Sequence, residues 1–170
     1  MPFGFGLCTS SRGARGFLLR TAAALLRYVG QVMSDEIELH DSCVAFERDD
    51  RTIVLRFCPA YVHHWEQVDG AWVGEGRRQA AELTLNDGTM ETDSEGVRDV
   101  SDGWIEVGGK RYENMLPVPF AIHGAARGRI ELVGVPPIEF SARGVVIRLI
   151  GEPDFVEALP AEWAPHVEAG

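Results

Sequence analysis

Beyond the first 36 residues, apolar residues alternate with polar ones in short runs that turn residues separate, and this pattern restricts the chain to a fold built of strands. The clearest case is a hairpin whose turn is centred on residues 50–51. With that centre, Val44 lies opposite Phe57 and Phe46 lies opposite Leu55, so both apolar sets point to one face. The pattern therefore predicts an antiparallel pair with one buried face.

Further runs of the same kind follow along the chain and are bounded by Gly, Asn, Asp or Pro. They are residues 81–85, 103–107, 110–113, 129–133, 138–141 and 144–150. About seven short strands indicate a mainly β fold, either an antiparallel β-sandwich or a partly closed barrel. The run 144–150 is the most apolar, and we expect it to be a central strand. After it, Pro153 between two acids predicts one short C-terminal helix over residues 153–159.

Charge divides the chain unevenly. Residues 1–34 contain four arginines and no acid, so the other 136 residues hold 12 basic and 26 acidic side chains and a net charge of −14. We interpret 1–32 as a basic N-terminal extension outside the fold, 33–160 as a single β-rich domain and 161–170 as a flexible tail. Three origins of the extension stay open: a targeting or membrane-surface peptide, a helix that docks on the domain, or a start codon placed upstream of Met33.

The acidic domain excludes some partners and favours others. It repels phosphate backbones, so we expect no nucleic acid, and it attracts a basic protein partner. No charge-free run is long enough to span a bilayer, so we expect no membrane contact for the main domain. Three cysteines are too few for a disulfide framework, which favours the cytoplasm. The oligomeric state stays open.

Sequence motifs of the common enzyme classes are absent. The chain has no phosphate-binding glycine loop, no Gly-x-Ser-x-Gly, no His-Glu-x-x-His and no Cys-x-x-Cys. These absences favour a non-enzyme and imply no cofactor, although they leave unusual enzymes open.

One cluster of chemically capable residues remains. Extending the hairpin register places His40 opposite Tyr61 and His63 opposite Glu38, so the two segments meet at one end of the sheet. The candidate binding residues are His40, Asp41, Ser42, Tyr61, His63 and Trp65.

Three interpretations of this cluster stay open. His40 with His63 or His64 would suit a divalent metal, in a metal-binding domain or a metal-dependent enzyme. Only one of His63 and His64 serves such a site, because neighbouring strand residues point to opposite faces. His40 and Asp41 would suit acid–base chemistry beside Ser42. The third interpretation is structural, with Asp41 and Ser42 bonding turn backbone.

Two other groups of residues bear on function. The same register places Cys43 opposite Cys58, which we interpret as free cysteines in strands rather than a redox pair. Trp65, Trp72 and Trp104 fall in one central stretch, and Trp65, Trp72 or Trp104 would line the mouth of a barrel that binds a small molecule.

Four segments carry a resemblance. They are Leu39-His40-Asp41-Ser42, Ser101-Asp102-Gly103, the stretch from Asn114 to Pro119, and Gly151-Glu152-Pro153-Asp154-Phe155-Val156-Glu157. They resemble a group of small uncharacterised bacterial β-rich proteins, and the first also resembles the opening of immunity proteins of toxin systems. The resemblance implies a β domain that starts near Met33 and assigns no catalytic residue. Together with the charge, it leads us to expect a small acidic interaction module with an immunity-like role.

Overall fold

The computed structural model of the chain describes residues 33–92 and 96–165, which belong to the unit Met33–Gly170. The predicted extension 1–32 and residues 166–170 of the predicted tail lie outside the described residues. None of the described residues forms a helix with the length and apolarity that a membrane crossing needs. The described elements are β1 (Met33–Glu38), β2 (Cys43–Asp49), β3 (Thr52–Val68), β4 (Ala71–Asn86), β5 (Thr89–Glu91), β6 (Arg98–Val107), β7 (Lys110–Glu113), β8 (Met115–Val118), β9 (Phe120–Leu132), β10 (Val135–Leu159) and the 3-10 helix η1 (Ala161–Trp163).

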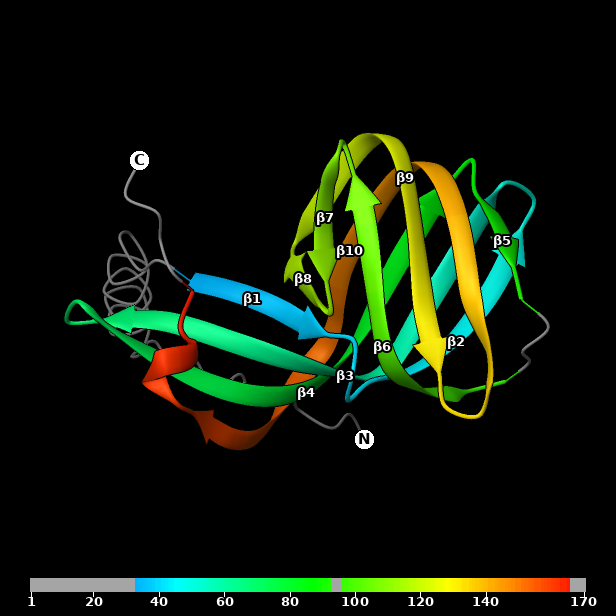
Figure 1. The fold of residues 1–170 in the computed structure, drawn as a ribbon. Helices are drawn as coiled ribbons and strands as arrows, with labels where there is room; N and C mark the ends of the chain where they lie inside the picture. The colour runs from blue at the N-terminus through cyan, green and yellow to red at the C-terminus, as the bar shows by residue number, and fades with distance from the viewer. Residues whose placement is uncertain (1–32, 93–95, 166–170) are drawn as a thin grey trace, which may run out of the picture. The chain divides into compact units, whose positions relative to one another are not determined.

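Six of the strands follow one another around a barrel (Figure 1). The order is β3, β4, β10, β9, β6 and β2, and every neighbouring pair is antiparallel. Strand β2 returns to β3, with which it pairs from Val44 to Asp49, but it meets β6 only through Cys43 and Val44. The barrel is therefore only partly closed, and the predicted mainly β fold is confirmed.

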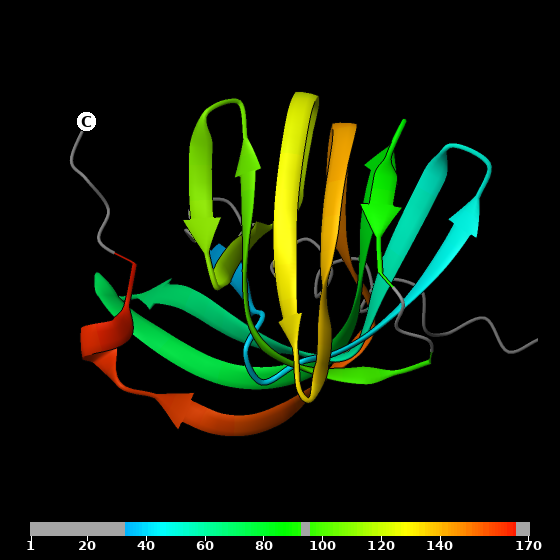
Figure 2. The same cartoon turned by 45° about the vertical axis from the view of Figure 1, so that its right-hand side comes forward.

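Three of these strands are too long for the barrel and continue beyond it as an arm (Figures 1 and 2). We define the arm as β1 with residues 60–68 of β3, 71–79 of β4 and 154–159 of β10. Within it β1 pairs with β3, β3 with β4, and β4 with β10. Strand β8 pairs with the side of β1 that faces away from β3. Helix η1 follows β10 and contacts β4.

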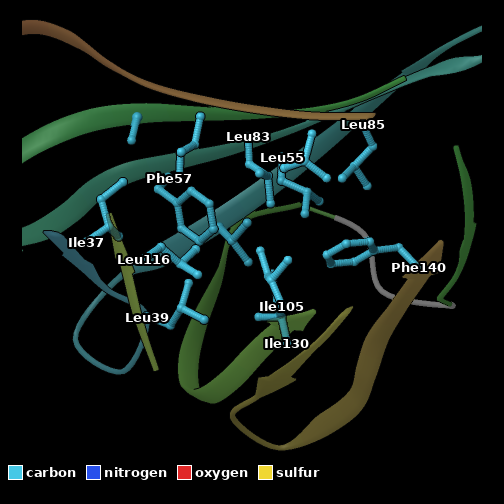
Figure 3. Packing of buried hydrophobic residues seen from close by; sticks show 14 of the residues in the cluster. Ile37, Leu39, Leu55, Phe57, Leu83, Leu85, Ile105, Leu116, Ile130 and Phe140 are labelled. Atoms are coloured by element: carbon cyan, nitrogen blue, oxygen red, sulfur yellow. The ribbon is translucent and has the colours of Figure 1, made fainter. Parts of the chain in front are cut away.

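Apolar side chains fill the barrel (Figure 3). Leu55, Phe57 and Leu83 are fully buried there, because alternate residues of each strand point inward. An apolar cavity between Leu83, Ile105 and their neighbours measures about 10 Å³, which is room for about one water molecule. The interior is thus a packed core at this place rather than a ligand chamber.

A β-bulge in β3 separates the barrel from the arm. Phe57 pairs with Ala81, but Ala60 pairs with Gln79, so β3 has one extra residue at this point. The extra residue reverses which side chains face the core: Phe57 points inward before it, and Ala60 and Val62 are the core residues after it. Tyr61 and its alternate neighbours along β3 are therefore turned to the outer face of the sheet.

The predicted hairpins are confirmed. Val44 pairs with Phe57 and Phe46 pairs with Leu55, as the alternation predicts. Strands β6 and β7 pair around Gly108 and Gly109, another hairpin that the sequence indicates. The run 144–150 lies in β10 between β4 and β9, which makes it a central strand.

The predicted C-terminal helix over residues 153–159 is wrong. These residues continue β10, and Asp154, Phe155 and Glu157 pair with β4. Pairing with β4 outweighs the local helix signal, and Pro153 is tolerated because it lies on an edge strand, in the register shift between Ile150 and Asp154. The only helical turn in the described part of the chain is η1, which follows this segment.

The extended register at the candidate cluster is also wrong. Glu38, not His40, pairs with Tyr61, and Glu36, not Glu38, pairs with His63. The reason is that residues 39–42 leave the strand as a turn, so the pairing of β1 with β3 is displaced by two residues from the hairpin register.

Candidate functional site

Six residues from five segments line a pocket of about 410 Å³ on the outer face of the arm. We call it the arm pocket. Its lining residues are Glu38 of β1, Asp41 of the turn, Tyr61 and His63 of β3, Glu157 of β10 and Trp163 of η1. Three of the six are carboxylates, two carry neutral aromatic rings, and none is Lys or Arg. The pocket is therefore acidic and partly aromatic.

Two glycines of β4 make room for aromatic side chains of β3. Gly76 pairs with His63 on one side and with Glu157 on the other. A methyl group at Gly76 would overlap the Tyr61 hydroxyl, and one at Gly74 would overlap the Trp65 ring. Because β4 has no side chains at these positions, Tyr61 reaches over β4 and its hydroxyl donates a 2.7 Å hydrogen bond to Glu157.

A second hydrogen bond holds the other wall of the pocket. Nε2 of His63 lies 2.8 Å from Oε2 of Glu38, and the amide of Asn114 approaches Oε1 of Glu38 at 3.4 Å. The His63 ring meets Tyr61 edge-on, with 5.5 Å between ring centroids. On its other side it stacks on Trp163 at 6.4 Å, with 17° between the ring planes. Trp163 is itself 59% exposed, so part of its ring remains open to solvent.

The carboxylates act together on the Tyr61 hydroxyl. Burial and the hydrogen bond to Glu157 raise the pKa of Tyr61 well above its usual range. The negative charges of Glu157, Glu38 and Asp41 raise it further. The phenol therefore stays protonated and continues to donate to Glu157, and the pocket has a negative potential at this point.

The carboxylates of the barrel and of the arm's far face have a different environment. Eight of those that the structure describes form ion pairs with arginine, as Glu82 does with Arg56 and Arg148. The others are Glu47, Glu75, Asp87, Glu106, Glu113, Glu131 and Glu139. In the arm pocket the bonding partners are His and Tyr instead. Arg78 pairs with Tyr61 in the register but is exposed and does not line the pocket.

The structure brings together three of the six predicted binding residues, Asp41, Tyr61 and His63. Ser42 is buried and bonds the backbone: its hydroxyl donates to the Glu38 carbonyl at 2.7 Å and accepts from the Tyr61 amide at 3.0 Å. Trp65 is fully buried, and its indole nitrogen has no hydrogen-bond partner.

His40 lies in a second pocket. It is exposed, its Nδ1 lies 3.1 Å from Oδ1 of Asp41, and its amide donates to the Asn114 side chain. The second pocket measures about 340 Å³ and shares Asp41 with the arm pocket. The Ser42 hydroxyl also lies there, but its proton is already donated to a carbonyl. The structural interpretation of this segment therefore accounts for Ser42 better than acid–base chemistry does.

The predicted metal ligands do not converge. His63 bonds Glu38, whereas His64 bonds Asp35 at 2.6 Å on the opposite face. His40 is held by the turn. Across residues 33–92 and 96–165, no three His, Cys, Asp or Glu side chains are grouped so that they could hold a metal ion. The geometry gives the metal alternative no support.

The tryptophans proposed for a barrel mouth do not share a site either. Trp65 is buried in the arm, and Trp72 lies near the hairpin that joins β3 to β4. Trp104 lies on the outside of the barrel, where the Arg111 guanidinium stacks on its ring at 4.0 Å. The three side chains therefore cannot line one cavity.

The cysteines of this region are free. The Cys43 thiol donates to Asp99 at 3.2 Å, and this hydrogen bond, with burial, raises the pKa of Cys43. The thiol is therefore protonated near neutral pH and is a poor nucleophile. Cys8 lies outside the described residues.

Sequence reasoning missed Glu157 and Trp163. Residues 153–159 were expected to form a helix and 161–170 a tail, so neither residue was placed near His63. The usable signal was the pair Gly74 and Gly76, since glycine inside a strand marks a place where a neighbouring side chain crosses closely.

Comparison of the chain with protein-family models, with curated proteins and with solved structures found no match. The case for a function therefore depends on the geometry of the site.

Proposed function

We propose that this protein is a small acidic interaction module that binds a basic protein partner at the arm pocket. One observation carries the proposal: Glu38, Asp41 and Glu157 line one pocket, and their hydrogen-bonding partners are His and Tyr rather than Arg. A pocket lined by three carboxylates and by no Lys or Arg attracts a cationic surface and speeds its association. The net charge of −14 on residues 35–170 acts in the same direction.

We place this function in the cytoplasm and outside catalysis. The two described cysteines are free, as is usual in a reducing compartment. The most buried hydroxyl of the cluster, that of Ser42, is engaged by the backbone and is not available as a nucleophile.

The test begins with affinity capture from a lysate of the source cells. The full chain is immobilised beside the double variant Glu38→Gln/Glu157→Gln and a control, Glu47→Gln/Glu139→Gln, whose two carboxylates lie on the barrel. We expect a basic protein that the chain and the control capture and the pocket variant loses. Calorimetry with that purified protein should give an affinity that falls as salt rises. Equal capture by the pocket variant, or an affinity indifferent to salt, would contradict the proposal.

An immunity-like role is a narrower form of this proposal. The segment that resembles immunity proteins forms the turn beside the arm pocket and contributes Asp41 to it. The basic partner would then be a toxin, encoded next to this protein. Where expression of that neighbour arrests growth, co-expression of this chain should restore growth and the Glu38→Gln/Glu157→Gln variant should not. A neighbour that this chain does not neutralise would contradict the role.

A further inference from the structure

The aromatic surface of the arm pocket is arranged to receive a flat cation. His63 and Trp163 stack with 17° between their planes, and Tyr61 lies edge-on to His63. Trp163 remains 59% exposed although it lies beside acidic side chains. The face of an indole ring attracts cations, and a planar guanidinium also stacks on it. A largely exposed tryptophan ring next to carboxylates therefore favours a cationic ligand over a neutral apolar one.

The carboxylates are already oriented for such a ligand. The Tyr61 hydroxyl fixes Glu157 and the His63 ring fixes Glu38. An ionised carboxylate has about four lone-pair positions, so one bond from Tyr61 leaves acceptor capacity on Glu157. Groups that are held in place before binding lose less entropy when the ligand arrives.

The same molecule shows how this combination binds a guanidinium. On the barrel, Arg127 bonds Glu106 at 2.9 Å while it lies 6.0 Å from the Trp104 ring. Arg111 stacks on that ring at 4.0 Å and forms an ion pair with Glu113. There the chain supplies the tryptophan, the carboxylates and the arginines. The arm pocket has the tryptophan and the carboxylates, and the arginine is missing from its lining residues.

We infer that the arm pocket receives the guanidinium of an arginine side chain of the partner protein, stacked on Trp163 and bonded to Glu157. This inference rests on the proposed function and specifies its central contact. A lysine ammonium would fit less well, because it has no planar face to stack on a ring and no pair of parallel N–H groups to match a carboxylate. The pocket's three carboxylates exclude an anionic ligand.

The probe is N-acetyl-L-arginine amide, which presents the side chain as a polypeptide does. It is titrated into the full chain labelled with nitrogen-15, beside N-acetyl-L-lysine amide and N-acetyl-L-citrulline amide, the neutral analogue of the same shape. We expect saturable shifts of the Trp163 indole and of the Tyr61 and His63 amides. The lysine compound should bind about threefold or more weakly, and citrulline should not bind.

Variants then locate the contact. Trp163→Leu and Glu157→Gln should each weaken binding about fivefold, in line with one cation–π contact or one ion pair. Trp104→Leu, which removes the tryptophan of the barrel, should leave binding unchanged. Thermal unfolding of each variant shows that it is folded.

Several results would overturn the inference: shifts centred elsewhere, citrulline binding equal to arginine, or equal weakening by Trp104→Leu. Tighter binding of free L-arginine than of its blocked form would identify a metabolite site instead. Failure here is distinct from failure of the proposed function. If the partner depends on Glu38 and Glu157 but the arginine probe does not bind, only the inference fails. If the probe binds and no basic partner depends on the pocket, the proposed function fails.

Discussion

The hydroxyl of Tyr61 in β3 donates to Oε1 of Glu157 in β10, 96 residues further along the chain. The two strands are not neighbours, since β4 lies between them. The bond forms because β4 has Gly76 at the crossing point, where any larger residue would overlap the phenol. It links the two long strands of the arm and gives the pocket one of its walls.

The Tyr61 hydroxyl should stabilise the fold by an amount that depends on pH. Replacement by Phe removes a hydrogen bond to a charged group, and we expect a loss of about 1.5 kcal/mol near pH 7. The unfolded chain releases the Tyr61 proton near pH 10, whereas the folded pKa is higher. The stabilisation is therefore present below pH 10 and decreases as the pH rises above it.

Thermal unfolding of the protein and of Tyr61→Phe, compared between about pH 8 and pH 11, measures this effect. The difference between the two melting temperatures should shrink toward the upper end of the range. Tyr112→Phe serves as the control, since Tyr112 packs on Phe120 outside the pocket. A difference that stays constant with pH would show that Glu157 does not hold the Tyr61 proton.

The two glycines Gly76 and Gly128 should respond differently to alanine. At Gly76 the new methyl group displaces the Tyr61 hydroxyl, which lies at the far end of a half-buried side chain, and breaks its hydrogen bond to Glu157. We expect modest destabilisation but loss of binding at the arm pocket. At Gly128 the methyl group overlaps the Phe140 ring inside the barrel, and overpacking there costs about 1–3 kcal/mol.

Calorimetry with the basic partner and thermal melts separate these two effects. Gly128→Ala should bind as the unchanged chain does at temperatures where it is folded, although it melts earlier. Binding that survives in Gly76→Ala would contradict the role of Tyr61 and Glu157 in the pocket.

The barrel was predictable from the sequence because its signal is local. Val44 and Phe57 face each other with one turn between them, and alternation sets their register. The pocket was not, because its residues are brought together by irregularities. The bulge before Ala60 turns Tyr61 and His63 away from the barrel core, and Pro59, which lies in the bulge, marks its place without setting the register beyond it.

The end of β10 was mispredicted for a related reason. Pro153 beside acids is a start signal for an isolated helix, and the signal is correct as local chemistry. Strand pairing outweighs this helix signal, because Asp154 and Glu157 pair with residues of β4. A helix over these residues would lose that pairing. Tertiary pairing of this kind is set by residues that lie about 80 positions earlier, and a single sequence does not connect them.

The sequence left a catalytic interpretation open for the segment with His40, Asp41 and Ser42, and the structure favours a structural role for Ser42. Ser42 is 2% exposed and joins the end of β1 to β3 through two backbone hydrogen bonds. In Ser42→Ala the Tyr61 amide and the Glu38 carbonyl lose their partner, and we expect a loss of about 2–3 kcal/mol in the free energy of unfolding. Urea unfolding measures it, with Ser101→Ala, at an exposed position, as the control. A loss no larger than that of the control would leave the Ser42 hydroxyl without its bridging role.

Protonation of Glu82 should account for part of the stability that the fold loses in acid. Arg148 first, and then Arg56, hold the pKa of the Glu82 carboxyl below its ordinary value of 4.5. The ionised Glu82 carboxylate therefore stabilises the fold above pH 4.5. This stabilisation is lost as the pH falls through the lower pKa that Glu82 has in the folded state. The pairs are on the surface, so Glu82→Gln should cost less than about 1 kcal/mol near neutral pH. Urea unfolding at about pH 7 and pH 3 should show the difference between protein and variant only at the higher pH, and less of it in high salt. A difference that persists at pH 3 would mean that Glu82 stabilises the sheet by packing rather than by charge.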